Sequence, residues 1–420
     1  MRWFVIVANS LFAAALALFL TGSVAQPASV SDEARAYTRP IEFDYVNWTL
    51  EAIFVKAEQG SLDIQRYLPA KEQHDLVISY IHLVTQVQDL NDQITRIYAD
   101  PAIKDARQAS ASQREELAKQ EQRLNSLSPV VENILQSQVA SVLASQGLTL
   151  GGQPIPPVLY HVTPLPYALI VSPRSVIREE ANISLNPGMN VDQMNTLENR
   201  VSQGLNVSAL VVPVGGIGIY PTMVMQTSDL SFLLETISHE WTHNFLTLRP
   251  LGVSYDASPA LRTMNETTAS IVGKEIGMET LRRYYPELAP PPGQPGQQPG
   301  ESAPAPKPAF DFNAQMHATR VEVDRLLSEG KITQAEQYMD ARRLVFWDHG
   351  YLIRKLNQAY FAFYGAYADV PGGAAGNDPV GPAVRRLRAE SPNLAAFLNR
   401  ISWMTSFDQL QRAVAAAPSG

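Results

Sequence analysis

The segment from Thr227 to Pro250 constrains this chain more than any other, because it has the pattern of a helix with two different faces. An N-cap and a first-turn acid are available at its start, and Pro250 stands just past its end. Its apolar residues recur at spacings of three and four, at Leu230, Leu233, Leu234, Ile237, Trp241 and Phe245. His239 and His243 lie one turn apart on the opposite side. We therefore expect one face in a core and two imidazoles directed into a cleft.

These histidines belong to the run His239-Glu240-Trp241-Thr242-His243. Two neutral imidazoles can take two corners of a tetrahedral zinc site, and the Glu beside the first can reach a water on the metal. The alternative is a surface helix with two solvated histidines, which the apolar face argues against. The motif predicts one Zn²⁺ per chain.

A catalytic zinc usually takes a third protein ligand, and the next helical segment, residues 258–283, offers two acids. Glu275 falls about 180° from Glu266, so both cannot serve one metal. A single Glu on a helix is most often solvated, but Glu266 shares its face with a stripe of small residues that permits a close helix–helix approach. The members of this stripe are Ala269, Ser270, Gly273 and Gly277. The stripe favours Glu266 as the third ligand.

At this point the chain resembles the gluzincin group of zinc metallopeptidases, which includes thermolysin-like enzymes and zinc aminopeptidases. That group combines H-E-x-x-H with a Glu about twenty residues downstream on a second helix, often as Asn-Glu, and here Asn265 precedes Glu266. The resemblance implies that His239, His243 and Glu266 bind zinc and that Glu240 is the general base.

The resemblance covers only residues 207–283, and it departs from the thermolysin-like pattern in one place. That pattern often has an Asp four residues after the ligand Glu, where it supports a ligand His, and this chain has Ser270 there. The supporting contact is therefore weaker, altered or supplied elsewhere.

Composition narrows the class of protein and its partners. A net charge of −8 over 420 residues, without a long basic run, argues against nucleic acid. The start of the chain has Arg2, an apolar run to Leu20 and small residues at Ser23 and Ala25, which predicts a signal peptide over 1–25. The alternative is an uncleaved anchor with membrane association. Either interpretation places the protein outside the cytoplasm: secreted, periplasmic or on the outer face of the membrane.

The fold class expected is α+β and predominantly helical, with a zincin-like catalytic domain that contains a small mixed sheet and the H-E-x-x-H helix. Strands are expected at 167–171, 210–214 and 217–224, and a short helix at 192–204. The expected divisions are a helical domain at 30–148, a linker at 151–157, the catalytic domain at 150–285, a Pro/Gly-rich flexible loop at 289–308 and a helical part at 310–416 that completes the cleft. Helices are expected at 42–59, 69–98, 108–145, 312–329, 332–368 and 383–415.

Two further groups of residues are candidates for the site. The Gly-rich strand before the zinc helix, with Gly218, Ile219 and Tyr220, has the pattern of an edge that could pair with an extended peptide, and a plain hairpin is the alternative. Zincins place a later Tyr or His beside the metal to stabilise the oxyanion, and Tyr360 and His349 are the candidates here. For both, packing within an aromatic helix is the alternative.

The sequence thus predicts an exported zinc metallopeptidase that acts on a peptide or protein. Both endo- and exo-cleavage fit the motif. The competing interpretation is a non-catalytic exported binding or scaffold protein, whose helical N-terminal domain acts and whose zinc site is structural or vestigial.

Overall fold

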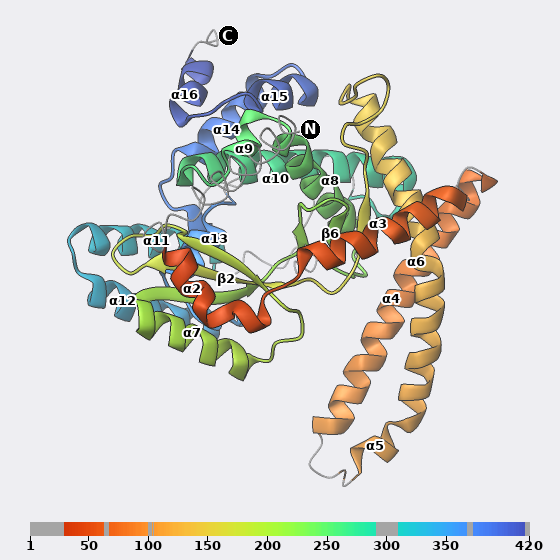
Figure 1. Cartoon of the computed structure of the whole chain (residues 1–420), viewed down its shortest axis with the longest axis horizontal. Helices are drawn as coiled ribbons and strands as arrows, with labels where there is room; N and C mark the ends of the chain where they lie inside the picture. Colours follow the sequence, from red (N-terminus) through yellow and green to blue (C-terminus); the bar gives the residue numbers. More distant parts are fainter. Residues whose placement is uncertain are drawn as a thin grey trace, which may run out of the picture.

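The computed structural model describes residues 29–62, 67–99, 103, 105–290, 310–367 and 373–415. The predicted signal segment and nearly all of the predicted loop at 289–308 lie outside these residues. Within them the chain is predominantly helical with two small sheets, which confirms the α+β class (Figure 1). No helix in the described ranges combines the length and the apolar character that crossing a bilayer requires.

The helices are α2 (Val30–Thr38), α3 (Tyr45–Leu62), α4 (Ala70–Ala99), α5 (Ala106–Ala109), α6 (Ala111–Ser145), α7 (Val191–Leu205), α8 (Leu230–Thr247), α9 (Pro250–Val253), α10 (Pro259–Tyr284), α11 (Phe312–Ser328), α12 (Ile332–Asp348), α13 (Gln358–Tyr364), α14 (Val380–Glu390), α15 (Leu394–Ile401) and α16 (Phe407–Ala415). Short 3-10 turns are η1 (Arg39–Ile41), η3 (Pro286–Leu288) and η4 (Gly373–Ala375). The strands are β1 (Tyr160–Val162), β2 (Tyr167–Pro173), β3 (Ala181–Leu185), β4 (Val207–Pro213), β5 (Gly216–Ile217) and β6 (Thr222–Val224).

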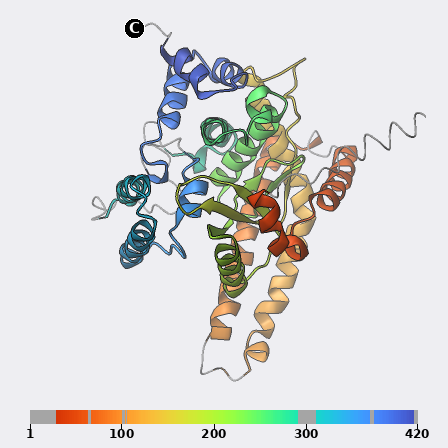
Figure 2. The same ribbon diagram turned by 60° about the vertical axis from the view of Figure 1, so that its left-hand side comes forward.

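The largest core joins helices from both ends of the chain. Val84 of α4, Leu135 of α6, Leu234 of α8, Val272 of α10 and Leu387 of α14 are all buried in it. Helices α4 and α6, from the helical domain expected at 30–148, therefore share a core with the histidine-bearing helix. We call the helices that share this core, α4, α6, α8, α10 and α14–α16, the helical lobe. Figures 1 and 2 show the far halves of α4 and α6 projecting from it as a long hairpin, with α5 at its tip.

The strands form two three-stranded sheets, where one small mixed sheet was expected. The larger is antiparallel, in the order β3-β2-β4, and the smaller is mixed, in the order β1-β6-β5. Both faces of the larger sheet are covered. Leu169 and Val211 face α2 and α7, while Ile170 and Leu210 face α13. We call this sheet with α2, α7 and α11–α13 the sheet lobe; in Figure 1 it lies below α8 and α10.

Two of the expected C-terminal helices are broken. The helix expected over 332–368 ends at Asp348, because Gly350 adopts φ 86°, a left-handed conformation that stops a helix. It restarts at α13, where Asn357 accepts a hydrogen bond from the backbone N–H of Tyr360 and acts as the N-cap. The helix expected over 383–415 is likewise divided into α14, α15 and α16, with Asn393 capping α15.

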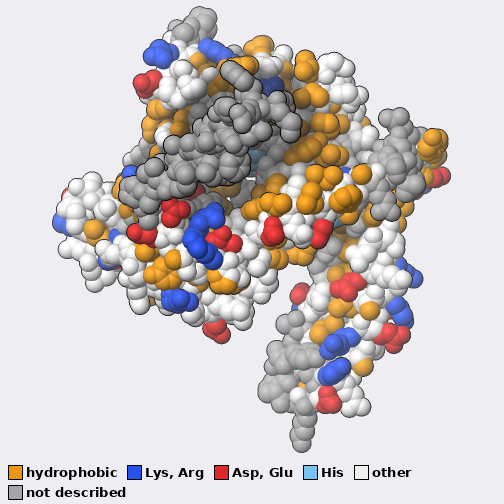
Figure 3. Space-filling view, viewed as in Figure 1, with side chains coloured by type: hydrophobic (Ala, Val, Ile, Leu, Met, Phe, Trp, Pro, Cys, Tyr) orange, Lys and Arg blue, Asp and Glu red, His pale blue; other side chains and the backbone are white. Residues whose placement is uncertain are grey.

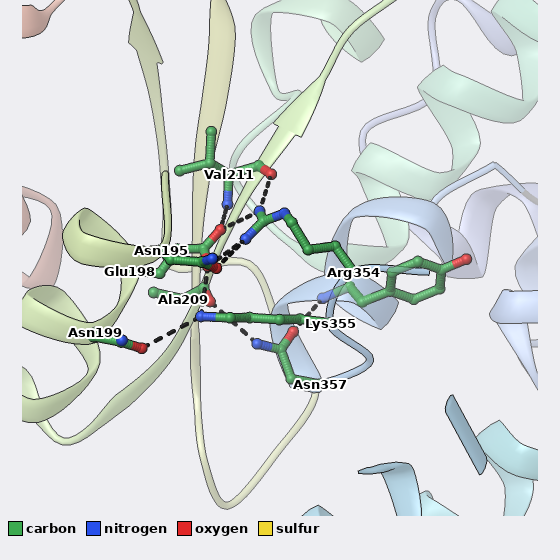
Figure 4. Close-up of polar contacts among 9 residues, drawn as sticks. Asn195, Glu198, Asn199, Ala209, Val211, Arg354, Lys355 and Asn357 are labelled. Atoms are coloured by element: carbon green, nitrogen blue, oxygen red, sulfur yellow. Dashed lines mark hydrogen bonds and ion pairs between the residues drawn. The ribbon is translucent and has the colours of Figure 1, made fainter. Parts of the chain in front are cut away.

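The connection between α12 and α13 is fastened to the edge of β4 by a buried network of charges (Figure 4). Glu198 of α7 is fully buried and accepts from the Arg354 guanidinium and from the Lys355 ammonium, the latter at 2.6 Å. Arg354 also donates to the carbonyl of Val211 at 2.9 Å, and Asn357 donates to that of Ala209 at 3.1 Å. These side chains hydrogen-bond to backbone groups of β4 that would otherwise be unpaired at the edge of the sheet.

The expected linker at 151–157 is mostly exposed and makes hydrogen bonds at its end. The indole N–H of Trp241 donates to the carbonyl of Pro156 at 2.8 Å, and Tyr220 donates to that of Pro157 at 3.2 Å. The segment thus carries the chain across the buried face of α8.

Candidate metal centre

Helix α8 is formed as its pattern predicts. Asp229 is the N-cap, with its carboxylate accepting from the backbone N–H of Phe232 at 3.0 Å. Every member of the apolar face, from Leu230 to Phe245, is buried. His239 and His243 keep 14% and 16% of their side-chain surface exposed on the opposite side. Core packing on one face therefore fixes where the two imidazoles project.

Helix α10 lies directly against α8, and small residues make this approach sterically feasible. A Cβ atom added to Gly277 would lie 2.7 Å from the backbone N of Glu235, and one on Gly273 would lie 3.0 Å from the Cβ of His239. No larger side chain fits at either position without moving a backbone. The stripe of small residues therefore allows the close approach of the two helices that its spacing predicts, and this approach brings Glu266 near the histidines.

Three side-chain atoms converge at the contact of these helices. His239 Nε2 lies 3.1 Å from His243 Nε2, and Glu266 Oε2 lies 3.6 Å and 3.5 Å from these two nitrogens. Bonds of about 2.1 Å in a tetrahedral zinc site place neighbouring ligand atoms about 3.4 Å apart. The three atoms already have the spacing of ligands around one ion, and they form a group that could hold a metal.

The surroundings of these atoms also fit a metal ion. Glu266 Oε2 is buried and has no hydrogen-bond partner among the described residues, whereas its Oε1 accepts from the Tyr255 hydroxyl at 2.5 Å. His243 Nδ1–H donates to Asn265 Oδ1 at 2.8 Å, which leaves Nε2 as the lone-pair atom directed at the cluster. Asn265 thus supplies a supporting contact of the kind that Ser270 does not.

The charge of Glu266 is stabilised inside the protein. Burial alone would raise the pKa of its carboxyl, but the imidazoles of His243 and His239 hold that pKa well below its ordinary range. The group is therefore an anion, which is the form that binds a cation.

Glu240 occupies a different environment from Glu266. Its side chain is buried on the cleft side of α8, and burial raises the pKa of its carboxyl despite the two nearby imidazoles. A Cβ on Gly216 would lie 2.6 Å from Glu240 Oε1, and one on Gly218 would lie 2.8 Å from the Cβ of His243. The glycines around β5 let that strand lie directly over the motif.

A cleft of about 480 Å³ opens over the cluster between the helical lobe and the sheet lobe. Its floor contains His239, Glu240, His243 and Glu266. Aromatic and aliphatic side chains form much of the remaining wall, including Tyr45, Tyr167, Val214, Ile217, Ile219, Tyr255, Phe363 and Tyr367. The cleft can hold an extended, largely apolar ligand above the cluster.

The structure places three of the residues proposed from the sequence away from the cleft. His349 is exposed beyond the end of α12 and stacks on Phe310 with ring centroids 3.9 Å apart. Tyr360 packs against Phe361 and Tyr364. Neither lines the cleft, because the break between α12 and α13 turns both away. Gly218 and Ile219 do line it, but Tyr220 points to Pro157 instead.

Two other tyrosines, Tyr367 and Tyr255, lie near the three ligand atoms, where Tyr360 and His349 were expected. The Tyr367 ring stacks against the His239 ring at an interplanar angle of 26°, with centroids 6.3 Å apart, and the Tyr255 hydroxyl donates to Glu266. Neither has a signal in the sequence, because Tyr255 follows a helix of only four residues and Tyr367 follows α13 outside any periodic pattern. The excluded acid Glu275 lies on the far side of α10, paired with Arg388 at 2.7 Å.

Comparison of this chain with protein-family models, with curated proteins and with solved structures finds no match. The case for its function therefore rests on the chemistry of the cleft.

Proposed function

We propose that this protein is an exported, zinc-dependent metallopeptidase of zincin-like architecture, with the ion held by His239, His243 and Glu266. The observation that carries this proposal is the Glu240 carboxyl. It is buried beside a set of three ligand atoms on the floor of an open cleft. A structural zinc site closes its fourth position with protein and needs no carboxylate nearby.

The residues of the site would have separate roles in hydrolysis. A Zn²⁺ ion bound at the cluster would acidify a water and polarise a carbonyl group. Glu240 accepts the proton of the attacking water and passes it to the leaving amine, a role for which its raised pKa suits it. Asn265 and Tyr255 keep His243 and Glu266 in the orientation that binds the ion.

The small sheet supplies a place for the peptide backbone. Strands β5 and β6 pair as an antiparallel hairpin, and β5 is also an edge of the sheet β1-β6-β5 in the described residues. An extended peptide that pairs with this edge would pass directly over Glu240 and the ligand histidines. We propose Gly218 and Ile219 as backbone contacts for such a peptide.

The donor set of two imidazoles and one carboxylate also suits ferrous iron, and a structural or vestigial zinc in a binding protein remains the competing function. Elemental analysis of the purified protein separates the metals, and we expect about one zinc per chain. His239→Ala, His243→Ala and Glu266→Ala should each lose the metal. Glu275→Ala is the matched control on α10 and should keep it.

Glu240→Gln tests the reaction itself. The variant should retain zinc and its melting temperature, because neither the ligand set nor the shape of the side chain changes. Its hydrolysis of a peptide library should fall at least about a hundredfold. Equal turnover by the variant and the parent would end the peptidase proposal and favour the non-catalytic alternative.

A further inference from the structure

Helix α3 has two apolar faces, and the structure buries only one. Ala52 is buried against the helical lobe, and Trp48 donates from its indole N–H to Thr163 at 3.4 Å. On the other side a second row of apolar side chains is exposed to solvent: Val46 by 74%, Leu50 by 54%, Ile53 by 47% and Phe54 by 75%. A helix that is apolar all round is normally covered all round. We call these four residues the α3 apolar face.

Helix α3 begins at the wall of the candidate active site. Tyr45, the first residue of α3, lines the cleft and donates from its hydroxyl to Ser184 at 2.7 Å, and Ser184 also lines the cleft. From Val46 to Phe54 the face extends about 12 Å away from that point. Figure 1 shows α3 running outward from the middle of the molecule, and Figure 3 shows hydrophobic side chains gathered over the same region.

The charges around the face select among the ligands that could cover it. Helices that lie in a membrane surface carry Lys and Arg beside their apolar side. The single cation within α3, Lys56, points inward to Glu132 at 2.5 Å. The exposed polar residues that flank the face are Asp44, Asn47 and Glu51. Acidic flanks on a chain of net charge −8 disfavour an anionic lipid surface. The start of α3 at the cleft wall favours instead the polypeptide that the cleft would hold.

We propose that the α3 apolar face is an extension of the substrate site that holds an apolar stretch of the polypeptide outside the cleft. The inference rests on the proposed peptidase function and deepens it. The substrates it selects are unfolded or partly unfolded polypeptides, in which a run of large apolar residues lies within a few residues of the bond that is cleaved.

The test uses peptides that share one cleavable segment, identified from the library digest. In one pair the segment is extended, at either end, by a run of Leu and Phe, and in the other by a Gly/Ser run of equal length. The variant is Leu50→Ser/Phe54→Ser. We expect its kcat/KM to fall about tenfold on one of the apolar peptides, through KM, and to stay within about twofold on the Gly/Ser peptides. Leu352→Ser, which alters a side chain that is 77% exposed elsewhere, is the control and should change neither.

Equal cleavage of both peptide types by the parent would overturn the inference and leave the peptidase proposal intact. Fluorescence anisotropy of the labelled apolar peptide with Glu240→Gln measures how tightly the peptide binds when it is not cleaved. This binding should weaken about tenfold when Leu50→Ser/Phe54→Ser is added. Flotation with phosphatidylcholine vesicles that this double change abolishes, or a dimer in light scattering that it dissociates, would assign the face to a bilayer or to a second copy. Either result would also overturn the inference.

Discussion

Two regions meet at the cleft, and they are held in place by different forces. The helix pair α8/α10, which carries the three ligand atoms, is held by close backbone contact, with Gly273 and Gly277 against α8. The opposite wall, from the end of α12 through Phe363 to Tyr367, is held by the charge network on Glu198 and by the packing of α13 on the larger sheet. Packed backbone fixes positions to within tenths of an ångström, whereas an ion-paired loop can move as a unit. The three ligand atoms therefore lie on the wall that close backbone contact holds in place.

The largest loss of stability should come from the charge network. Arg354→Met removes the guanidinium from a fully buried carboxylate and leaves Glu198 with Lys355 as its remaining cation among the described residues. We expect the free energy of unfolding to fall by about 3 kcal/mol. Zinc content should be unchanged, because α8 and α10 are not touched. Chemical denaturation and elemental analysis together check this.

Arg386→Met is the matched control, because Arg386 pairs with Glu390 on the exposed surface of α14 at 2.7 Å. Such a pair contributes at most about 1 kcal/mol. If Arg354→Met cost no more than this control, the network would be an incidental contact, and the contrast between the two walls would fail.

Gly277→Ala should have a smaller effect on stability and a larger one on the metal. The added Cβ meets the backbone of Glu235, so α10 must move away from α8 and carry Glu266 with it. We expect a loss of about 1–3 kcal/mol in stability together with weaker zinc binding. Zinc titration against a competing chelator measures the second effect. Unchanged affinity would show that Glu266 reaches the cluster without the close approach.

The contrast between the walls also explains how far the sequence could lead. The pair α8/α10 was predictable because its signals are local: a cap at Asp229, an apolar stripe, two histidines at i and i+4, and small residues in line with Glu266. The helical periodicity of the sequence continues through Gly350 and Asn357, although these residues end one helix and begin another. The structure therefore places Tyr360 and His349 away from the cleft, where the sequence had suggested they would lie. The position of the segment after α12 depends on its contact with Glu198, which lies more than a hundred residues earlier in the chain. No local pattern carries that information.

The smallest effects on stability are expected at Tyr255 and Tyr367, the two tyrosines near the cluster. Tyr255→Phe removes the hydroxyl that donates to Glu266 Oε1, so zinc affinity should fall about tenfold while turnover at saturating zinc stays close to that of the parent. Tyr367→Phe touches no ligand atom, so zinc affinity should stay the same. If Tyr367 stabilises the oxyanion from its place beside His239, kcat should fall about a hundredfold. Tyr360→Phe is the control and should alter neither, because that ring packs away from the cleft. A loss of kcat confined to Tyr360→Phe would mean that the wall closes differently on substrate. The wall that contains Tyr360 would then supply the oxyanion group only after it closes on the substrate.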